Sequence, residues 1–233
     1  TEEADSVATA LENDGRIIVA GSLFLVGEAL GILKKELDGQ KALLGFCGAP
    51  WTLALYLVEG GSPGEGRNLR ELLYRQPEVA RDLLAKVTSA CEQYVRLQCE
   101  SGADAIQLFD SWASLCPSPF YEEWCLEPAR KIREACNLPM ILFSRGAANR
   151  LSEQISVGAE GLAIDWATPL AEARKTVGLS TALQGNLDPI VLETNPDTVQ
   201  REVLQILKDR KNDAGFIFNG GHGLSPATRI DCV

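Results

Sequence analysis

Ile217-Phe218-Asn219-Gly220-Gly221-His222-Gly223 is a short apolar run that opens into a glycine-rich loop, and this loop holds the only histidine of the 233-residue chain. A run of this kind is typical of a buried strand. Glycine allows the sharp turns and close backbone approaches that a binding loop at the end of a strand needs. The pattern alone supports two interpretations equally: His222 is presented to a ligand, or it faces water on a connecting turn.

The same arrangement recurs upstream, where short apolar runs are followed by polar residues and then by a helical pattern. Strands are predicted over residues 42–47, 104–109, 139–143, 161–164, 180–183 and 215–218. Strands that are apolar on both faces and alternate with helices indicate a parallel sheet covered by helices. A (β/α)8 barrel and an open doubly wound sheet both fit this α/β pattern. No Gly-x-Gly-x-x-Gly or Walker loop follows a strand, which weakens the nucleotide-binding open sheet.

Helical spacing of apolar residues predicts the intervening helices. They are expected over residues 23–37, from about 50, and over 67–75, 78–100, 119–136, 148–157, 169–176 and 196–210. In the last of these, four side chains are expected to face inward: Val199, Val203, Ile206 and Leu207.

Polar residues follow almost every predicted strand. They are Ser111, Arg145, Asp165, Asn186, Asn219 and His222. In a barrel the carboxyl ends of the strands meet at one mouth, where barrel enzymes carry their chemistry. Each of these residues could instead be a turn residue or a helix cap, as Asp188 before Pro189 is expected to be. Tyr56, on one helix face with Thr52, fits a boundary position with its ring inward and its hydroxyl in water.

Charge and cysteine content exclude several classes of function. The formal net charge is -10, which disfavours nucleic acid and anionic membrane surfaces as partners. The seven cysteines form no Cys-x-x-Cys pair, so we expect reduced, mostly buried thiols, a reducing compartment and no structural zinc site. No apolar run reaches the length of a membrane span. Thr1 is typical of neither a signal peptide nor a natural start, so a fragment is expected.

Several motifs, in order between about residues 26 and 224, resemble those of the uroporphyrinogen decarboxylase family. Their order and approximate spacing agree along most of the chain, which a lone Gly-His-Gly would not achieve. The matching stretches are Gly45-Phe46-Cys47-Gly48-Ala49-Pro50-Trp51-Thr52-Leu53, Tyr56-Leu57-Val58-Glu59-Gly60-Gly61, Gln107-Leu108-Phe109-Asp110-Ser111-Trp112-Ala113, Asp165-Trp166, Leu183-Gln184-Gly185-Asn186-Leu187-Asp188-Pro189 and Asn219-Gly220-Gly221-His222-Gly223.

The resemblance implies a single (β/α)8 barrel domain over residues 1–233, acting as a homodimer without metal or organic cofactor. It implies a carboxy-lyase that decarboxylates the four acetate side chains of uroporphyrinogen III to give coproporphyrinogen III, in the cytoplasm or the plastid stroma. The product leads to haem and chlorophyll. Tyr56, Ser111 and His222 match the family's substrate-binding tyrosine, serine or threonine, and histidine.

The chain also departs from the family pattern. The arginine-rich loop and the strand ending in the catalytic aspartate have no counterpart, so no catalytic residue is assigned. About six of eight strand–helix units are expected, and the final helix is missing. Gly220 stands where the family usually has leucine, and Phe143-Ser144-Arg145-Gly146 is atypical. We therefore expect this chain alone to show little or no decarboxylase activity.

Two alternatives remain open at this point. One is a corrinoid- or zinc-dependent methyltransferase on the same barrel, which would need cysteine and histidine ligands around zinc. The sole histidine here has no cysteine near it in sequence before Cys232. The other is a non-catalytic protein that binds a porphyrinogen or pairs with an intact partner.

Overall fold

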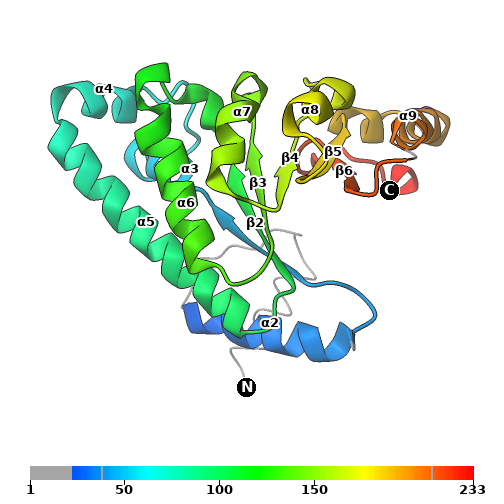
Figure 1. The fold of residues 1–233 in the computed structure, drawn as a ribbon, viewed down its shortest axis with the longest axis horizontal. Helices are drawn as coiled ribbons and strands as arrows, with labels where there is room; N and C mark the ends of the chain where they lie inside the picture. The colour runs from blue at the N-terminus through cyan, green and yellow to red at the C-terminus, as the bar shows by residue number, and fades with distance from the viewer. Residues whose placement is uncertain (1–22, 38, 211) are drawn as a thin grey trace.

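Six parallel strands form one sheet in the computed structural model, which describes residues 23–37, 39–210 and 212–233. The sheet order follows the chain without reversal, so every crossover steps in the same direction (Figure 1). A doubly wound sheet would reverse its order at a switch point. The strands are β1 (Leu44–Gly48), β2 (Ala105–Asp110), β3 (Met140–Ser144), β4 (Gly161–Ala163), β5 (Ala182–Leu187) and β6 (Phe216–Gly220). The order therefore confirms the predicted partial (β/α)8 barrel.

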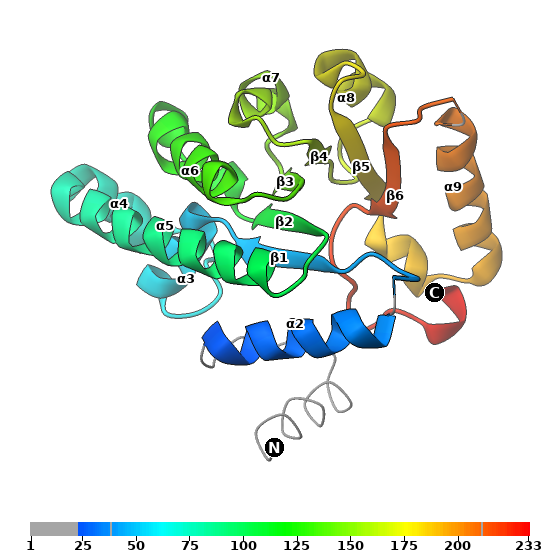
Figure 2. The same ribbon diagram turned by 60° about the horizontal axis from the view of Figure 1, so that its bottom comes forward.

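Figure 2 shows the strands as a curved array with the helices outside it. The longest helix, α5, packs against β1, α3 and α6, and α2 lies beside α5. The helices are α2 (Leu23–Leu37), α3 (Pro50–Glu59), α4 (Arg67–Arg75), α5 (Pro77–Glu100), α6 (Glu127–Ala135), α7 (Leu151–Gln154), α8 (Leu170–Val177) and α9 (Pro196–Asp209). In a barrel the helices cover only the outer face of the sheet, because the side chains of the inner face pack against one another in the interior.

The two faces of the sheet have different interiors. Alternate residues of β2, such as Ile106 and Leu108, belong to the large core between the sheet and the helices. The opposite face carries a smaller apolar cluster in which Ile141, Phe143 and Ala163 pack with Phe109. The alternation follows from the two-residue period of a strand.

A hydrogen bond crosses the inner face between strands that are not neighbours. The Gln184 side-chain amide of β5 donates to the Gln107 side-chain oxygen of β2 over 3.3 Å, and both side chains are buried. Strands β3 and β4 lie between β2 and β5 in the sheet. The contact is possible only because the sheet curls strongly toward this face.

The edge strands β1 and β6 each pair with a single neighbour among the described strands. Large apolar side chains are exposed on both: Leu44 and Phe46 on β1, and Ile217 and Phe218 on β6. The described part of the barrel is therefore an open arc with two apolar edges, which agrees with the predicted six strand–helix units.

Several predicted boundaries were wrong. Strand β2 includes Asp110, β5 continues to Leu187 where a loop was predicted from residue 184, and β6 includes Asn219 and Gly220. Polar residues and glycine lower the strand propensity of these ends, but pairing with the neighbouring strand extends them. Leu207 of α9 is exposed, whereas Val199, Val203 and Ile206 pack inward as predicted.

The single helix predicted over residues 119–136 is also wrong. A 3-10 turn (Ser118–Phe120) and a π turn (Glu122–Leu126) precede α6. Pro128 lacks the N–H that would continue an α-helical ladder into this segment, so the backbone takes a wider turn before it. The helix predicted over 148–157 is likewise α7 flanked by two 3-10 turns, Ala148–Arg150 and Ile155–Val157.

Candidate active site

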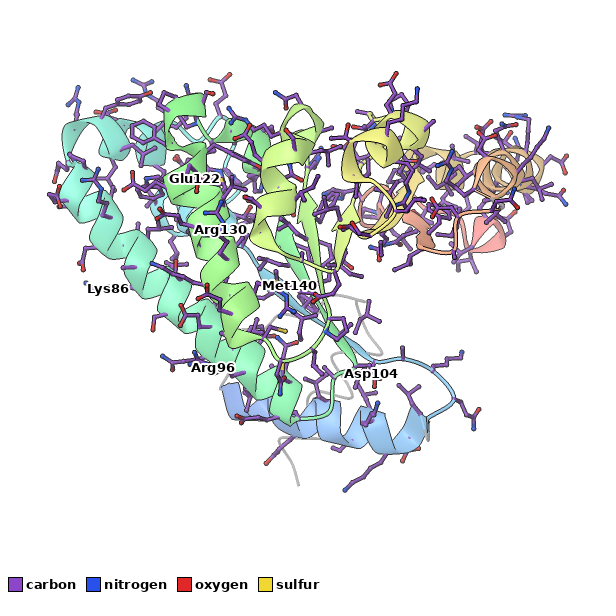
Figure 3. The ribbon with its side chains drawn as sticks, in the orientation of Figure 1. Lys86, Arg96, Asp104, Glu122, Arg130 and Met140 are labelled. Carbon is purple, nitrogen blue, oxygen red and sulfur yellow. The ribbon has the colours of Figure 1, made fainter. Side chains whose placement is uncertain are left out.

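The amino ends of β1 and β2 are joined to α2. Lys34 Nζ lies 2.5 Å from Asp104 Oδ1, and the other Asp104 oxygen accepts the Leu43 N–H over 2.8 Å. Figure 3 shows Asp104 beside α2, whereas Glu122 of the π turn and Arg130 of α6 lie farther toward the top of the view. The predicted site residues follow the carboxyl ends of the strands, so they lie at the opposite end of the sheet from Asp104.

Tyr56 and the segment that contains Ser111 meet at this end. Tyr56 lies in α3, directly after β1, and its hydroxyl oxygen accepts the Trp112 indole N–H over 3.1 Å. The two rings cross edge to face at 76°. Ser111 sits between Asp110, the last residue of β2, and Trp112. The boundary interpretation placed the Tyr56 hydroxyl in water. Tyr56 is 44% exposed, but its hydroxyl oxygen accepts a hydrogen bond from the protein.

His222 follows β6 and packs against the ends of β3 and β4. Its ring lies edge to face with Phe143, at 6.1 Å between centroids, and with Trp166, at 6.3 Å. The Arg145 guanidinium lies over the Trp166 ring at 5.4 Å. Partial desolvation of the ring, and then the nearby Arg145 charge, lower the pKa of His222, although the residue is exposed; the Gly223 backbone and the Asp165 charge act in the opposite direction. The lowered pKa favours the neutral imidazole, which can donate one N–H.

An aromatic row connects the two ends of the arc. It consists of Phe46, Phe109, Phe143, His222 and Trp166, with successive ring centroids 5.9–6.3 Å apart. The row runs along the inner face from β1 to the loops after β4 and β6. It provides an apolar surface beside the polar groups of Arg145 and His222. No measured contact joins His222 directly to Tyr56 or Ser111 in the described residues.

Two of the polar residues at the strand ends, Asp165 and Asn186, bond to loop backbone. The Asp165 carboxylate accepts the Gly146 N–H over 2.6 Å and the Ala167 N–H over 3.1 Å. The Asn186 amide donates to the carbonyl oxygens of Asp165 and Thr168. Asn219 accepts only the N–H of its own neighbour, Gly220. Asp188 is a cap as predicted, since it accepts the Ile190 N–H of the next turn. Asn186 and Asn219 are strand residues and not caps.

The His222 loop lies directly against the loop after β4. A Cβ atom at Gly221 would come within 2.6 Å of the Trp166 backbone nitrogen. Only glycine permits this approach, because the atom met is backbone and cannot move aside cheaply. Gly221 therefore places His222 beside Trp166.

Asp110 is a second buried carboxyl group at the carboxyl end of the sheet, with 1% of its surface exposed. Burial raises its pKa to about 6, against the lowering effect of hydrogen bonds from Thr52 and Cys125. The Thr52 hydroxyl donates to Asp110 over 2.7 Å.

All seven cysteines are free, and only Cys99 is not fully buried.

Sequence reasoning missed Trp112 and Phe143 as parts of the site and left Arg145 open. Trp112 stands inside a matched motif, which was the available signal. Phe143 lies two residues after Ile141 on β3, and both belong to the inner-face cluster. Within the described ranges, no group of three or more His, Cys, Asp or Glu side chains is placed to hold a metal ion. No helix of the described residues has the length and apolarity to span a membrane.

Replacing Arg145 with glutamine is expected to raise the pKa of His222. The substitution removes a positive charge that disfavours the imidazolium, while burial of the ring is unchanged. Because the chain has one histidine, its ring proton resonances can be followed by NMR without assignment. The exposed Arg201 of α9, replaced by glutamine, is the control and should leave the pKa of His222 unchanged. An unchanged or lower pKa of His222 in R145Q would contradict the placement of Arg145.

Comparison with known proteins gives one consistent family. Residues 5–233 match the family model described as uroporphyrinogen decarboxylase. A protein of that description from Alkalilimnicola ehrlichii is 41% identical over 209 residues, which cover 87% of this chain and 57% of that protein. One from Dichelobacter nodosus is 40% identical over 216 residues, covering 92% of this chain and 63% of that protein. The chain thus spans about three-fifths of the length of these relatives.

Among solved structures similar to the chain is one that matches most of its length. It is described as a methyltransferase from Methanosarcina mazei, with a TM-score of 0.76 over 89% of this chain and 60% of that one. The sequences are 22% identical, so the likeness concerns the fold alone.

Proposed function

Because the chain belongs to the uroporphyrinogen decarboxylase family, we propose that it forms the substrate-binding mouth of a carboxy-lyase acting on uroporphyrinogen III. The reaction removes CO2 from the four acetate side chains and gives coproporphyrinogen III. The observation that carries this proposal is the aromatic row, with Arg145 and His222 at one end and Tyr56 after the strand at the other. A large ring system with carboxylates on its rim needs an apolar surface bordered by hydrogen-bond donors.

The charge of the chain restricts where such a substrate can bind. A net charge of -10 repels a polycarboxylate, so a local positive group is required. Arg145 supplies that charge beside Trp166. His222, in the neutral form that its lowered pKa favours, can donate an N–H to a carboxylate without adding charge. Tyr56 and Ser111 supply hydroxyl groups on the side of the mouth after β1 and β2.

The proposed reaction needs little covalent chemistry from the protein. Protonation of a pyrrole carbon gives the substrate a positive charge. When the bond to CO2 breaks, the electron pair of that bond stays on the substrate and neutralises this charge. The side chains at the mouth then have to hold the carboxylates in place, orient the reacting acetate and limit water. Homodimerisation, action without a metal or organic cofactor, and a place in the cytoplasm or plastid stroma belong to this proposal.

Titration with uroporphyrin III, followed by quenching of tryptophan fluorescence, tests the binding mouth. Trp166 and Trp112 both lie there, so a bound porphyrin should quench them. We expect saturable binding by this chain and a loss of about tenfold in affinity in His222→Ala, since a hydrogen bond to a charged group is removed. The surface variant Arg201→Gln should bind like the wild type. Saturable binding that His222→Ala leaves unchanged would contradict the proposed site, and no binding would contradict the proposed function.

The reaction itself is tested by incubating the complete protein with uroporphyrinogen III under anaerobic conditions and separating the products by chromatography.

A further inference from the structure

Trp112 is held by three hydrogen bonds to side chains of one helix, α3. Its backbone N–H donates to the Thr52 hydroxyl oxygen over 3.1 Å. Its carbonyl oxygen accepts the Trp51 indole N–H over 2.9 Å. Its own indole N–H donates to the Tyr56 hydroxyl oxygen over 3.1 Å. Both backbone polar groups and the ring of Trp112 are therefore fixed relative to α3.

Thr52 connects the backbone of Trp112 to Asp110. The Thr52 hydroxyl has one proton, and it is donated to Asp110 Oδ1 over 2.7 Å inside the core. The Thr52 oxygen then has lone pairs left, which accept the Trp112 N–H. An ionised carboxylate can only accept, so the order of donors runs from Trp112 through Thr52 to Asp110.

The indole nitrogen of Trp112 also fixes the role of the Tyr56 hydroxyl. An indole N–H can donate but cannot accept, so the Tyr56 oxygen must be the acceptor in their hydrogen bond. The Tyr56 proton is thereby left for another acceptor. Within the described part of the chain, Tyr56 donates no hydrogen bond to protein, and its side chain is partly exposed at the mouth.

We propose that Trp112 is a positioning residue that orients the Tyr56 hydroxyl as a hydrogen-bond donor to a substrate carboxylate, and that Thr52 and Asp110 hold Trp112 in place for this role. The assignment of the acceptor as a substrate carboxylate rests on the proposed function. The hydrogen-bonded arrangement itself rests on the four contacts above and can be tested without ligand.

The ligand-free test follows the four indole N–H resonances of 15N-labelled tryptophan. Trp112→Phe identifies the resonance of Trp112 by its loss. Tyr56→Phe and Thr52→Val should each shift it, because one removes the acceptor and the other releases the backbone of Trp112. Thr52→Ser keeps the hydroxyl and should restore the wild-type position. A Trp112 resonance that stays unmoved in Tyr56→Phe would overturn the proposal.

The ligand test is a double-mutant cycle on uroporphyrin III affinity. We expect Tyr56→Phe and Trp112→Phe each to weaken binding about fivefold to tenfold. The double variant should be no weaker than Tyr56→Phe alone, since Trp112 acts through the hydroxyl that is already gone. Tyr74→Phe, on the exposed face of α4, is the control and should bind like the wild type.

The outcomes separate the two proposals. If the affinity loss of the double variant equals the product of the two single losses, Trp112 acts independently of Tyr56. That result would refute the positioning role but not the proposed binding mouth. No uroporphyrin binding by the wild-type chain would refute the proposed function and with it the carboxylate acceptor. The NMR shift then decides whether Trp112 and Tyr56 are bonded as described.

Discussion

Replacing Trp51 with alanine is expected to lower the free energy of unfolding by about 4 kcal/mol. The side chain is 0% exposed and packs edge to face on Trp124, with ring centroids 6.0 Å apart. Alanine would leave a cavity between α3 and the π turn before α6 that the surrounding elements can fill only in part. It would also leave the Trp112 carbonyl oxygen without the indole N–H that it accepts.

Urea unfolding followed by far-UV circular dichroism measures this loss. Leu57→Ala is the matched control, because Leu57 lies on the same helix and is 64% exposed, so its removal should cost about 0.5 kcal/mol or less. Trp51→Phe removes the N–H and part of the indole but keeps a large aromatic ring, so it should cost less than Trp51→Ala. A loss below about 1 kcal/mol in Trp51→Ala would show that this part of the core is loosely packed.

Replacing Arg174 with methionine is expected to lower the free energy of unfolding by about 3–5 kcal/mol. The Arg174 guanidinium donates to both oxygens of Asp213, and both side chains are only 10% exposed. It also donates to the carbonyl oxygens of Gly178, Thr181 and Gly215, which lie after α8 and before β5 and β6. Methionine fills similar volume but leaves a buried carboxylate and three carbonyl groups without this donor.

The same unfolding measurement checks this result. Arg201→Met is the control, because Arg201 is 66% exposed and pairs with the exposed Glu202, so a change of about 0.5 kcal/mol or less is expected. Adding Asp213→Asn to Arg174→Met should recover part of the loss, because the buried carboxylate would otherwise keep only the more distant Arg210, 3.8 Å away, as a charge partner. If Arg174→Met unfolds no more easily than Arg201→Met, the ion pair does not stabilise the join between α8 and β6.

Local patterns predicted most of the fold. The helices α2 and α4 have the predicted bounds, and the remaining strands and long helices differ by a few residues. The prediction failed where contacts distant in sequence decide the structure. Residues 184–187 contain polar side chains and a glycine and were assigned to a loop. Gln184 instead bonds Gln107, 77 positions away, and Leu187 packs into a core that includes Cys232. No local propensity carries that information.

The candidate site was predicted in part. The residues Tyr56, Ser111 and His222 all lie at the carboxyl end of the sheet, as the motifs indicated, and their joint role in binding stays a prediction. Asp165 and Asn186 looked equally suited to a site, but their side chains brace neighbouring loops. Trp112 was not singled out, because its role depends on contacts with α3, about 60 positions earlier in the chain.

The side-chain amides of Gln107 and Gln184 form a chord across the arc of strands. The length of a chord, together with the number of strands beneath it, determines the radius of the arc. This hydrogen bond is one contact that holds β2 and β5 at their present separation across two intervening strands. Shortening either side chain by one methylene would break it and leave two buried amides without a partner.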